Sequence, residues 1–305
     1  PSQLLPEQQI KLDALVVKLF EKRNLRKKPS LDIKQIASWN GLMVKALSEV
    51  SRFLNEPGFR CFAESNAQFI EDFLTAKDGK LSRCYTSGQS LEVAFLDDYA
   101  FVADSYIALY QTTLDEHWLW KAKRLADSAI AQFYDEHSGM FYYSSKEMPE
   151  VVARKMELTD GVMPAAASTL GHVLLSLGQY FHEESYCQIS LQMIYNLKIQ
   201  LAGAGPYTAN WARLYLRHLF QPVVVAIADE LDSVEFSRLN SLYYPPLIFA
   251  AATSSGKLPV LQPSHFLSAN KIFVCHGKSC FKPVASINQL CDMLDEIKLN
   301  RMDSK

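Results

Sequence analysis

The sequence predicts a mainly α protein built as an (α/α) toroid of helical hairpins, with a small α/β subdomain at its C-terminal end. Two observations predict the toroid: helices that are apolar almost all round alternate with helices that carry one apolar stripe, and this pair recurs about every 60 residues. A third observation marks the appendage, because β-branched runs follow residue 220. We therefore expect a helical-hairpin domain over 1–220 and an α/β subdomain over 221–305.

The first hairpin is predicted over residues 40–54 and 59–75. Apolar residues recur at helical spacing in both segments, and the intervening Asn55-Glu56-Pro57-Gly58 supplies the stop signal between them. The second segment keeps its acidic residues away from its apolar face. Two helices joined by so short a turn pack antiparallel.

The same pair recurs twice more. Residues 94–113 are apolar almost all round, as expected of an inner helix, whereas 117–134 carry a single apolar stripe, as expected of an outer helix. Residues 161–179 and 182–201 repeat this pattern, and a further helix is predicted over 207–219. Three complete hairpins and the start of a fourth are therefore expected.

Spacing supports the repeat. The polar starts of the inner helices fall at Asn40, Asp98 and Asp160, steps of about 60 residues that match two helices with their turns. The connections 78–85 and 138–143 each place a glycine turn before strand-like residues, so we expect a short β-hairpin in each connection. These hairpins would lie along one rim of the toroid.

The appendage is predicted from buried apolar runs. Residues 223–227, 247–251 and 271–274 are typical of buried strands, and helices are expected over 233–242 and 286–298. The result is a small α/β layer.

Composition narrows the range of functions. Of 305 residues, 49% are hydrophobic, and 33 acidic residues nearly balance 31 basic ones. Such a balance favours an ordinary globular protein and gives no field to attract nucleic acid or an anionic membrane. Apolar runs stay far below the roughly 20 residues of a membrane helix, and the N-terminus lacks the pattern of a secretory signal. We expect a cytoplasmic protein that binds neither membrane nor nucleic acid.

Candidate functional residues gather at the starts of the inner helices, in the segments 38–42, 96–100 and 157–164. In an (α/α) toroid these starts surround a central cavity. Carboxylates there could serve as general acid and base on a sugar, and aromatic rings could stack on it. The predicted catalytic residues are Asp97, Asp98 and Asp160, and the predicted substrate-binding residues are Trp39, Asn40, Tyr99, Glu157 and Ser168.

The alternative is structural. Ser38 and Asp160 would then cap helices, while Asp97 and Asp98 would hydrogen-bond backbone groups between repeats. His172, inside an apolar helix, is expected to be a core histidine whose polar atoms are satisfied.

Cofactors and metals are not predicted. The sequence shows no His/Glu cluster, Cys-x-x-Cys pair or phosphate-binding glycine loop. Cys275 and Cys280 flank a turn beside His276 and Lys278 and form a redox candidate, although two small residues in a turn explain them as well. The core needs no disulfide framework, so reduced thiols are expected.

These helix starts and the Cys-x4-Cys turn resemble the family of thioredoxin-domain proteins related to the spermatogenesis-associated protein. The family pattern Ser-Trp-Asn-Gly-Leu is intact at 38–42, Leu-Glu-Asp-Tyr-Ala is matched at 96–100 with Asp97 for Glu, and the third motif keeps Asp160, Gly161, Pro164 and Ser168. The resemblance covers most of the chain and implies a six-hairpin glycosidase-like barrel similar to that of N-acylglucosamine 2-epimerases.

This chain departs from the family at Ala165, Ala166 and Ala167, which stand where the family has Ser-Gly-Asn and remove two polar groups from the expected pocket wall. The resemblance also implies a thioredoxin-like domain and a first barrel half with a His-Phe-Glu-Lys segment, which this sequence does not contain. The chain is thus expected to correspond to the C-terminal part of the barrel.

Two functions remain open. The first is carbohydrate binding or carbohydrate chemistry of the epimerase or hydrolase type, with acid and base carboxylates. The second is a non-catalytic assembly module that docks a thioredoxin-like domain or another copy of itself, which the alanine run at 165–167 favours.

Overall fold

A computed structural model describes residues 5–148, 153–201, 203, 205–220, 222–227, 233–242, 247–251, 258–261, 272–276 and 279–303. The chain separates into two compact units, Pro1–Lys34 and Gln35–Lys305. The described part of the first unit is helix α1 (Pro6–Asn24) and the segment after it, in which every residue is exposed. Lys22 and Arg23 lie in the last turn of α1, where basic side chains interact favourably with the helix dipole.

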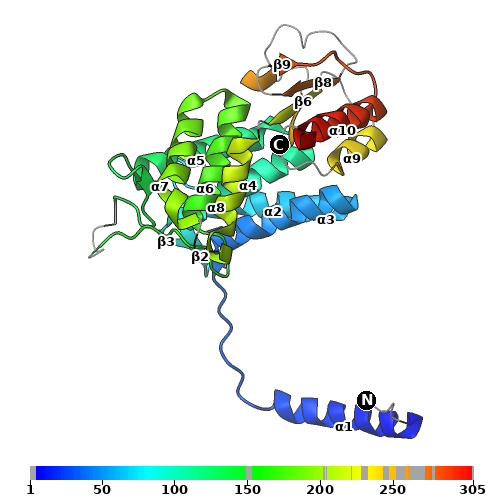
Figure 1. The fold of residues 1–305 in the computed structure, drawn as a ribbon. Coiled ribbons are helices and arrows are strands. Elements are labelled where there is room, and N and C mark those ends of the chain that lie inside the picture. The colour runs from blue at the N-terminus through cyan, green and yellow to red at the C-terminus, as the bar shows by residue number, and fades with distance from the viewer. Residues whose placement is uncertain are drawn as a thin grey trace. The chain divides into compact units, whose positions relative to one another are not determined.

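The second unit contains the predicted helical hairpins (Figure 1). Its helices are α2 (Ala37–Leu54), α3 (Pro57–Phe69) with a π-helical turn at Ile70–Leu74, α4 (Leu96–Thr113), α5 (Glu116–Phe133), α6 (Ala166–Phe181), α7 (Glu184–Leu201) and α8 (Ala209–Leu219). Nearly every residue of α4 and α6 is buried, whereas α5 buries a single stripe. The predicted alternation of inner and outer helices is therefore confirmed.

Three of the inner helices, α2, α4 and α6, end in the same way. Asn55, Leu114 and His182 close α2, α4 and α6 in the left-handed conformation, with φ of 54°, 57° and 52°. A left-handed residue reverses the chain after the last helical turn, so the next helix begins within two residues of it. Residues other than glycine adopt this conformation at a small cost, which the packing of the hairpin offsets.

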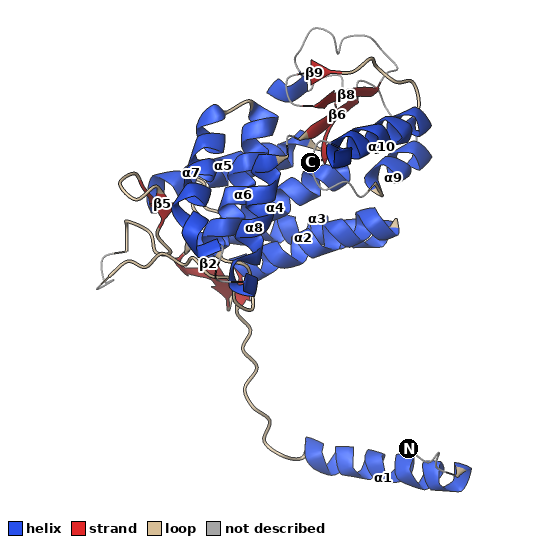
Figure 2. Ribbon diagram, viewed as in Figure 1, coloured by secondary structure: helices blue, strands red, loops and turns tan. Residues whose placement is uncertain are grey.

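Short antiparallel strands decorate the connections (Figure 2). Strands β2 (Ser82–Thr86) and β3 (Gln89–Val93) pair with each other and with β1 (Gln35–Ile36), and β4 (Tyr134–Asp135) pairs with β5 (Met140–Phe141). Ser87 and Gly88 both have positive φ, which is the two-residue turn that suits the twist of a hairpin. Both predicted hairpins are present.

The C-terminal sheet has the order β7-β6-β8-β9, and its strands are β6 (Val223–Ile227), β7 (Leu247–Ala251), β8 (Ile272–His276) and β9 (Ser279–Cys280). Strands β6 and β7 are parallel, and β8 runs antiparallel to β6. Helices α9 (Ser233–Asn240) and α10 (Ile287–Asp303) contribute to the core on one face. Tyr180, on α6, donates its hydroxyl hydrogen to the carbonyl oxygen of Phe249.

The sheet and the toroid share buried residues. Ile248 and Ala250 on β7 belong to the same core cluster as the inner helices. The separation into compact units falls after Lys34, and Gln35–Lys305 forms one unit, so a domain boundary at residue 220 stays a prediction. In the described parts of the chain, no helix combines the length and the apolar character that crossing a membrane requires.

Candidate functional site

Asp98 joins the starts of two inner helices. Its Oδ1 accepts a hydrogen bond from the backbone N–H of Ser38 at 2.9 Å, and its Oδ2 accepts from the N–H of Phe95 and from Nη1 of Arg83, each at 2.9 Å. The residue is fully buried. Burial and the neighbouring Asp97 raise the pKa of Asp98 to about 6, against the opposing effect of Arg83.

Asp97 shares the same arginine. Its Oδ1 lies 2.9 Å from Nη1 of Arg83 and also accepts from the N–H of Asp98. Glu157 is exposed, and partial desolvation and the charge of Asp97 raise its pKa. The single positive charge of Arg83 on β2 thus compensates the negative charges of both Asp97 and Asp98 at the start of α4.

Asp160 repeats the arrangement at the next two inner helices. Its oxygens accept from the N–H of Ala165, just before α6, and from the N–H of Asn210, in the first turn of α8, each at 2.9 Å. Ser168 donates to the carbonyl of Ala165 and accepts from Nδ2 of Asn210, both at 2.8 Å. This is the capping geometry of the structural alternative, while a catalytic role for Asp97, Asp98 and Asp160 stays a prediction.

The predicted binding residues differ in their exposure to solvent. Trp39 is 58% exposed and offers a ring to solvent, whereas Tyr99 is 1% exposed and packs on Phe133 with 5.4 Å between ring centroids. The Tyr99 hydroxyl accepts from the N–H of Leu81 at 3.1 Å. Asn40 uses its Nδ2 to donate to the carbonyl of Ile36 at 2.8 Å. Of the two rings predicted to stack on a sugar, Trp39 is therefore the accessible one, since Tyr99 is enclosed in the core.

A polar cavity lies within the inner helices, one turn further along them than the predicted residues. Its volume is about 110 Å³, and it is lined by Leu42, Lys45, Phe101, Asp104, Pro164, Thr169, His172, Asn210, Arg213 and Arg217. These residues come from α2, α4, α6 and α8 and from the segment before α6, while the outer helices contribute none of the lining residues. The cavity is therefore on the side of the inner helices that faces away from the outer ones.

An ion pair joins two walls of this cavity. Nζ of Lys45 on α2 lies 2.7 Å from Oδ2 of Asp104 on α4. The charge of Asp104 raises the pKa of Lys45, and Glu49 adds to this effect. Lys45 is therefore charged at neutral pH, with its remaining N–H groups free to donate to a ligand.

A histidine and an arginine form the opposite wall. Nε2 of His172 lies 3.0 Å from the carbonyl oxygen of Asn210, and Nη1 of Arg217 lies 3.0 Å from Nδ1. We assign the proton to Nε2, because arginine can only donate. Burial and Arg217 lower the pKa of His172 to about 3, so the imidazole is neutral. The prediction of a satisfied core histidine is confirmed, and the ring also lines the cavity.

The residues predicted from the sequence lie about one helical turn before the residues that line this cavity. Lys45 and Asp104 follow the predicted helix starts at Asn40 and Asp98 by five and six residues, and His172 follows the candidate binding residue Ser168 by four. Each is a polar residue inside an inner helix that is otherwise largely apolar. A polar residue inside a largely apolar helix is visible in the sequence. It identifies a cavity-lining residue only once the inner helices are known to surround a common central space.

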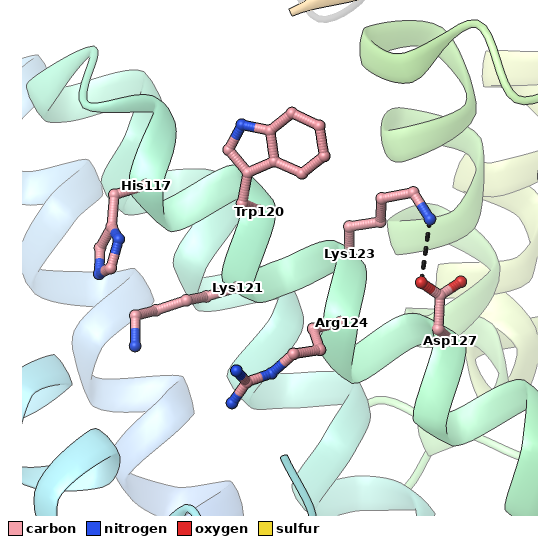
Figure 3. A pocket seen from close by; sticks show the side chains of 6 residues that line it. All are labelled: His117, Trp120, Lys121, Lys123, Arg124 and Asp127. Atoms are coloured by element: carbon pink, nitrogen blue, oxygen red, sulfur yellow. Dashed lines mark hydrogen bonds and ion pairs between the residues drawn. The ribbon is translucent and has the colours of Figure 1, made fainter. Parts of the chain in front are cut away.

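A second hollow lies on the outer surface of α5 (Figure 3). Its volume is about 460 Å³, and its lining residues, His117, Trp120, Lys121, Lys123, Arg124 and Asp127, all come from this one helix. Lys121 pairs with Glu71, and Lys123 pairs with Asp127 at 2.9 Å. Because its lysines are already compensated and only one helix forms it, this hollow is the weaker candidate for a site.

Cys275 and Cys280 form a disulfide, which corrects the expectation of reduced thiols. The two residues lie directly opposite each other in the antiparallel pairing of β8 with β9, and this pairing brings the sulfur atoms together. Their role as a redox pair stays a prediction. Among the described residues, no group of His, Cys, Asp or Glu side chains is arranged to hold a metal ion.

Replacement of Cys275 and Cys280 together by serine is expected to lower the free energy of unfolding by about 2 kcal/mol, because the lost crosslink closes only a short loop. Chemical denaturation of both proteins under non-reducing conditions measures this difference. Cys291, which is not in the disulfide, supplies the control variant Cys291→Ser. An equal stability of the double variant and the original chain would contradict the expectation.

The described helices form three hairpins and a further inner helix of an (α/α) toroid, with a polar cavity lined by the inner helices. The chain is 34% identical over 300 residues to spermatogenesis-associated protein 20 of Rattus norvegicus, covering 92% of this chain and 38% of that protein. It is 28% identical over 294 residues to an uncharacterized protein of Caenorhabditis elegans, covering 91% of this chain and 40% of that protein. The resemblance seen in the motifs is confirmed, and the chain spans about two fifths of these relatives' length.

A solved structure shows the same architecture. The α-mannanase BT2949 of glycoside hydrolase family 76 from Bacteroides thetaiotaomicron matches 63% of this chain and 53% of its own, with a TM-score of 0.50 and 15% sequence identity. At this identity the match establishes the fold. No family model matches the chain.

Proposed function

We propose that this chain binds a carbohydrate in the polar cavity between α2, α4, α6 and α8. The observation that carries the proposal is the convergence of charged and hydrogen-bonding side chains from all four inner helices on one hollow. Lys45 and Asp104 supply donors and acceptors for hydroxyl groups, and Thr169 adds a hydroxyl of its own. The matched mannanase acts on a carbohydrate, which is consistent with this ligand class.

The size of the cavity suggests how much of a ligand it holds. Binding pockets for small molecules commonly measure about 300–1,000 Å³, so a cavity of about 110 Å³ accommodates only part of a sugar. The rest of the ligand would extend toward the helix starts, where Trp39 exposes its ring. For a protein that also catalyses a reaction on the bound sugar, the proposed general acid and base are Asp97, Asp98 and Asp160.

The proposal predicts that a bound sugar raises the melting temperature of the whole chain. A ligand at a hundred times its dissociation constant stabilises the folded state by about 2.7 kcal/mol. Thermal unfolding is followed with a panel of neutral monosaccharides, disaccharides, sugar acids and N-acyl sugars, and any hit is titrated by calorimetry.

Two variants make this experiment specific. Lys45→Gln removes the cation of the cavity ion pair and should weaken binding, whereas Lys123→Gln removes the matched cation of an ion pair on α5 and should leave binding unchanged. Trp39→Ala tests the stacking wall. Absence of a stabilising sugar in the whole panel, or equal losses in both lysine variants, would overturn the proposal.

A docking role is the second candidate, because the first hairpin exposes large apolar side chains. Trp39, Met43 and Leu54 on α2 are 54–65% exposed, and Phe62 on α3 is 66% exposed. Apolar groups gathered on one hairpin often mark a protein contact. A thioredoxin-like domain or a second copy of the chain is the proposed partner. Sedimentation at increasing concentration tests the self-association form, which requires Phe62→Ser to shift any dimer toward monomer.

A further inference from the structure

The charges around the cavity do not balance. Lys45, Arg213 and Arg217 contribute three cations, and Asp104 is the one carboxylate among the lining residues. His172 adds no charge, because its pKa lies near 3. With Lys45 paired to Asp104, two guanidiniums remain for a ligand.

The two guanidiniums have neutral partners. Nη1 of Arg217 donates to Nδ1 of His172, and Nη2 donates to Oγ of Ser176 at 2.8 Å. Nη1 of Arg213 donates to Oδ1 of Asn210 at 3.3 Å. In the described portion of the chain, no carboxylate lies within ion-pair distance of either guanidinium. Each arginine carries five N–H donors, so both retain donors that these contacts do not use.

The positive charges of Arg213 and Arg217 also repel each other. They lie four residues apart on α8, a spacing at which like charges repel on the same helix face. Burial lowers the pKa of Arg217 and the charge of Arg213 lowers it further, while the carboxylate of Asp104 opposes these two effects. A negative group between them would relieve both effects, which is an arrangement expected of a ligand site rather than of a helix selected for stability alone.

We propose that the ligand of the cavity is an acidic sugar, whose carboxylate lies against the guanidiniums of Arg213 and Arg217 while its hydroxyl groups contact Lys45 and Asp104. This inference rests on the proposed function. A planar carboxylate matches the fork of a guanidinium, which donates two parallel hydrogen bonds to it. The ion pair of Lys45 with Asp104 supplies hydrogen-bond donors and acceptors for the hydroxyl groups of the sugar ring.

The test compares D-glucuronate, D-glucose and inorganic phosphate by calorimetric titration of the full chain at fixed ionic strength. We expect glucuronate to bind at least about tenfold more tightly than glucose, since hydrogen bonds to a charged group are worth more than neutral ones. Phosphate should bind more weakly than glucuronate, because it lacks the ring. Arg213→Gln should weaken the binding of glucuronate far more than the binding of glucose, and so remove most of the preference for glucuronate.

The controls separate this inference from the proposed function. Arg60→Gln removes an exposed arginine that pairs with Glu64 on α3, and it should leave all three affinities unchanged. Equal affinity for glucose and glucuronate would overturn the acidic-sugar inference and leave the carbohydrate site standing. Equal affinity for phosphate and glucuronate would overturn it in favour of a simple anion site. Binding of none of the three would overturn the acidic-sugar inference, and the proposed function would fall only if the wider sugar panel also failed.

Discussion

Replacement of Gly41 by alanine is expected to lower the free energy of unfolding by about 1–2 kcal/mol. A Cβ atom on Gly41 would lie 2.8 Å from the carbonyl carbon of Phe101 and 2.9 Å from the backbone nitrogen of Val102. Those atoms belong to the backbone of α4 and cannot rotate away, so α2 and α4 must separate. Overpacking of this kind costs about 1–3 kcal/mol or more, which exceeds the gain of about 1 kcal/mol from alanine's helix propensity.

The matched control is Gly58→Ala in the first turn of α3. A Cβ atom there meets nothing within 4 Å, so this variant should be as stable as the original chain or slightly more stable. Urea denaturation of the three proteins measures the comparison. Equal stabilities of the two variants would show that α2 and α4 do not approach as closely as described. The expected result would assign the glycine of the Ser38–Leu42 motif to helix packing.

The helices were predictable because their periodicity is local. The apolar spacing within 40–54 and 94–113 identified α2 and α4, and the strands 223–227 and 247–251 were identified from their apolar runs. The start of α6 was placed at residue 161, whereas the helix begins at Ala166. Asp160 holds the N–H of Ala165 at that point, and such a tertiary hydrogen bond leaves little trace in the sequence.

The candidate site was only partly predictable. Repeat spacing correctly placed Asp98 in the first turn of α4, whereas Asp160 lies in the segment before α6 and reaches the start of that helix through the N–H of Ala165. Their partners were not predictable, because Arg83 reaches Asp98 from a strand that no pattern connects with α4. The cavity at Lys45 and Asp104 depends on which faces of α2 and α4 point into the lumen, a property that appears only after the helices assemble.

Replacement of Asp98 by alanine is expected to lower the free energy of unfolding by about 3–5 kcal/mol, the usual cost of removing one partner of a buried ion pair. The guanidinium of Arg83 would then share a single carboxylate, Asp97. The N–H groups of Ser38 and Phe95 would also lose their acceptor, and both helix starts would be left uncapped. Denaturant titration at neutral pH measures this loss.

Glu64→Ala is the control, because Glu64 forms an exposed ion pair with Arg60 on α3 and should cost under about 1 kcal/mol. Asp98→Asn should lie between the two variants, since its amide oxygen can still accept one backbone hydrogen bond while the attraction to Arg83 is lost. A loss in Asp98→Ala no larger than in Glu64→Ala would contradict the capping role.

The same variants separate capping from catalysis. If Asp98 acts mainly by joining α2 to α4, Asp98→Asn should bind a cavity ligand with unchanged affinity at temperatures where it is still folded, because the cavity lies one turn further along these helices. If Asp98 is an acid or base, Asp98→Asn should stay nearly as stable as the original chain and lose turnover of any substrate found. Since all three acceptor contacts of Asp98 lie within the fold itself, we expect stability to change first, and Asp160→Asn to behave in the same way at α6 and α8.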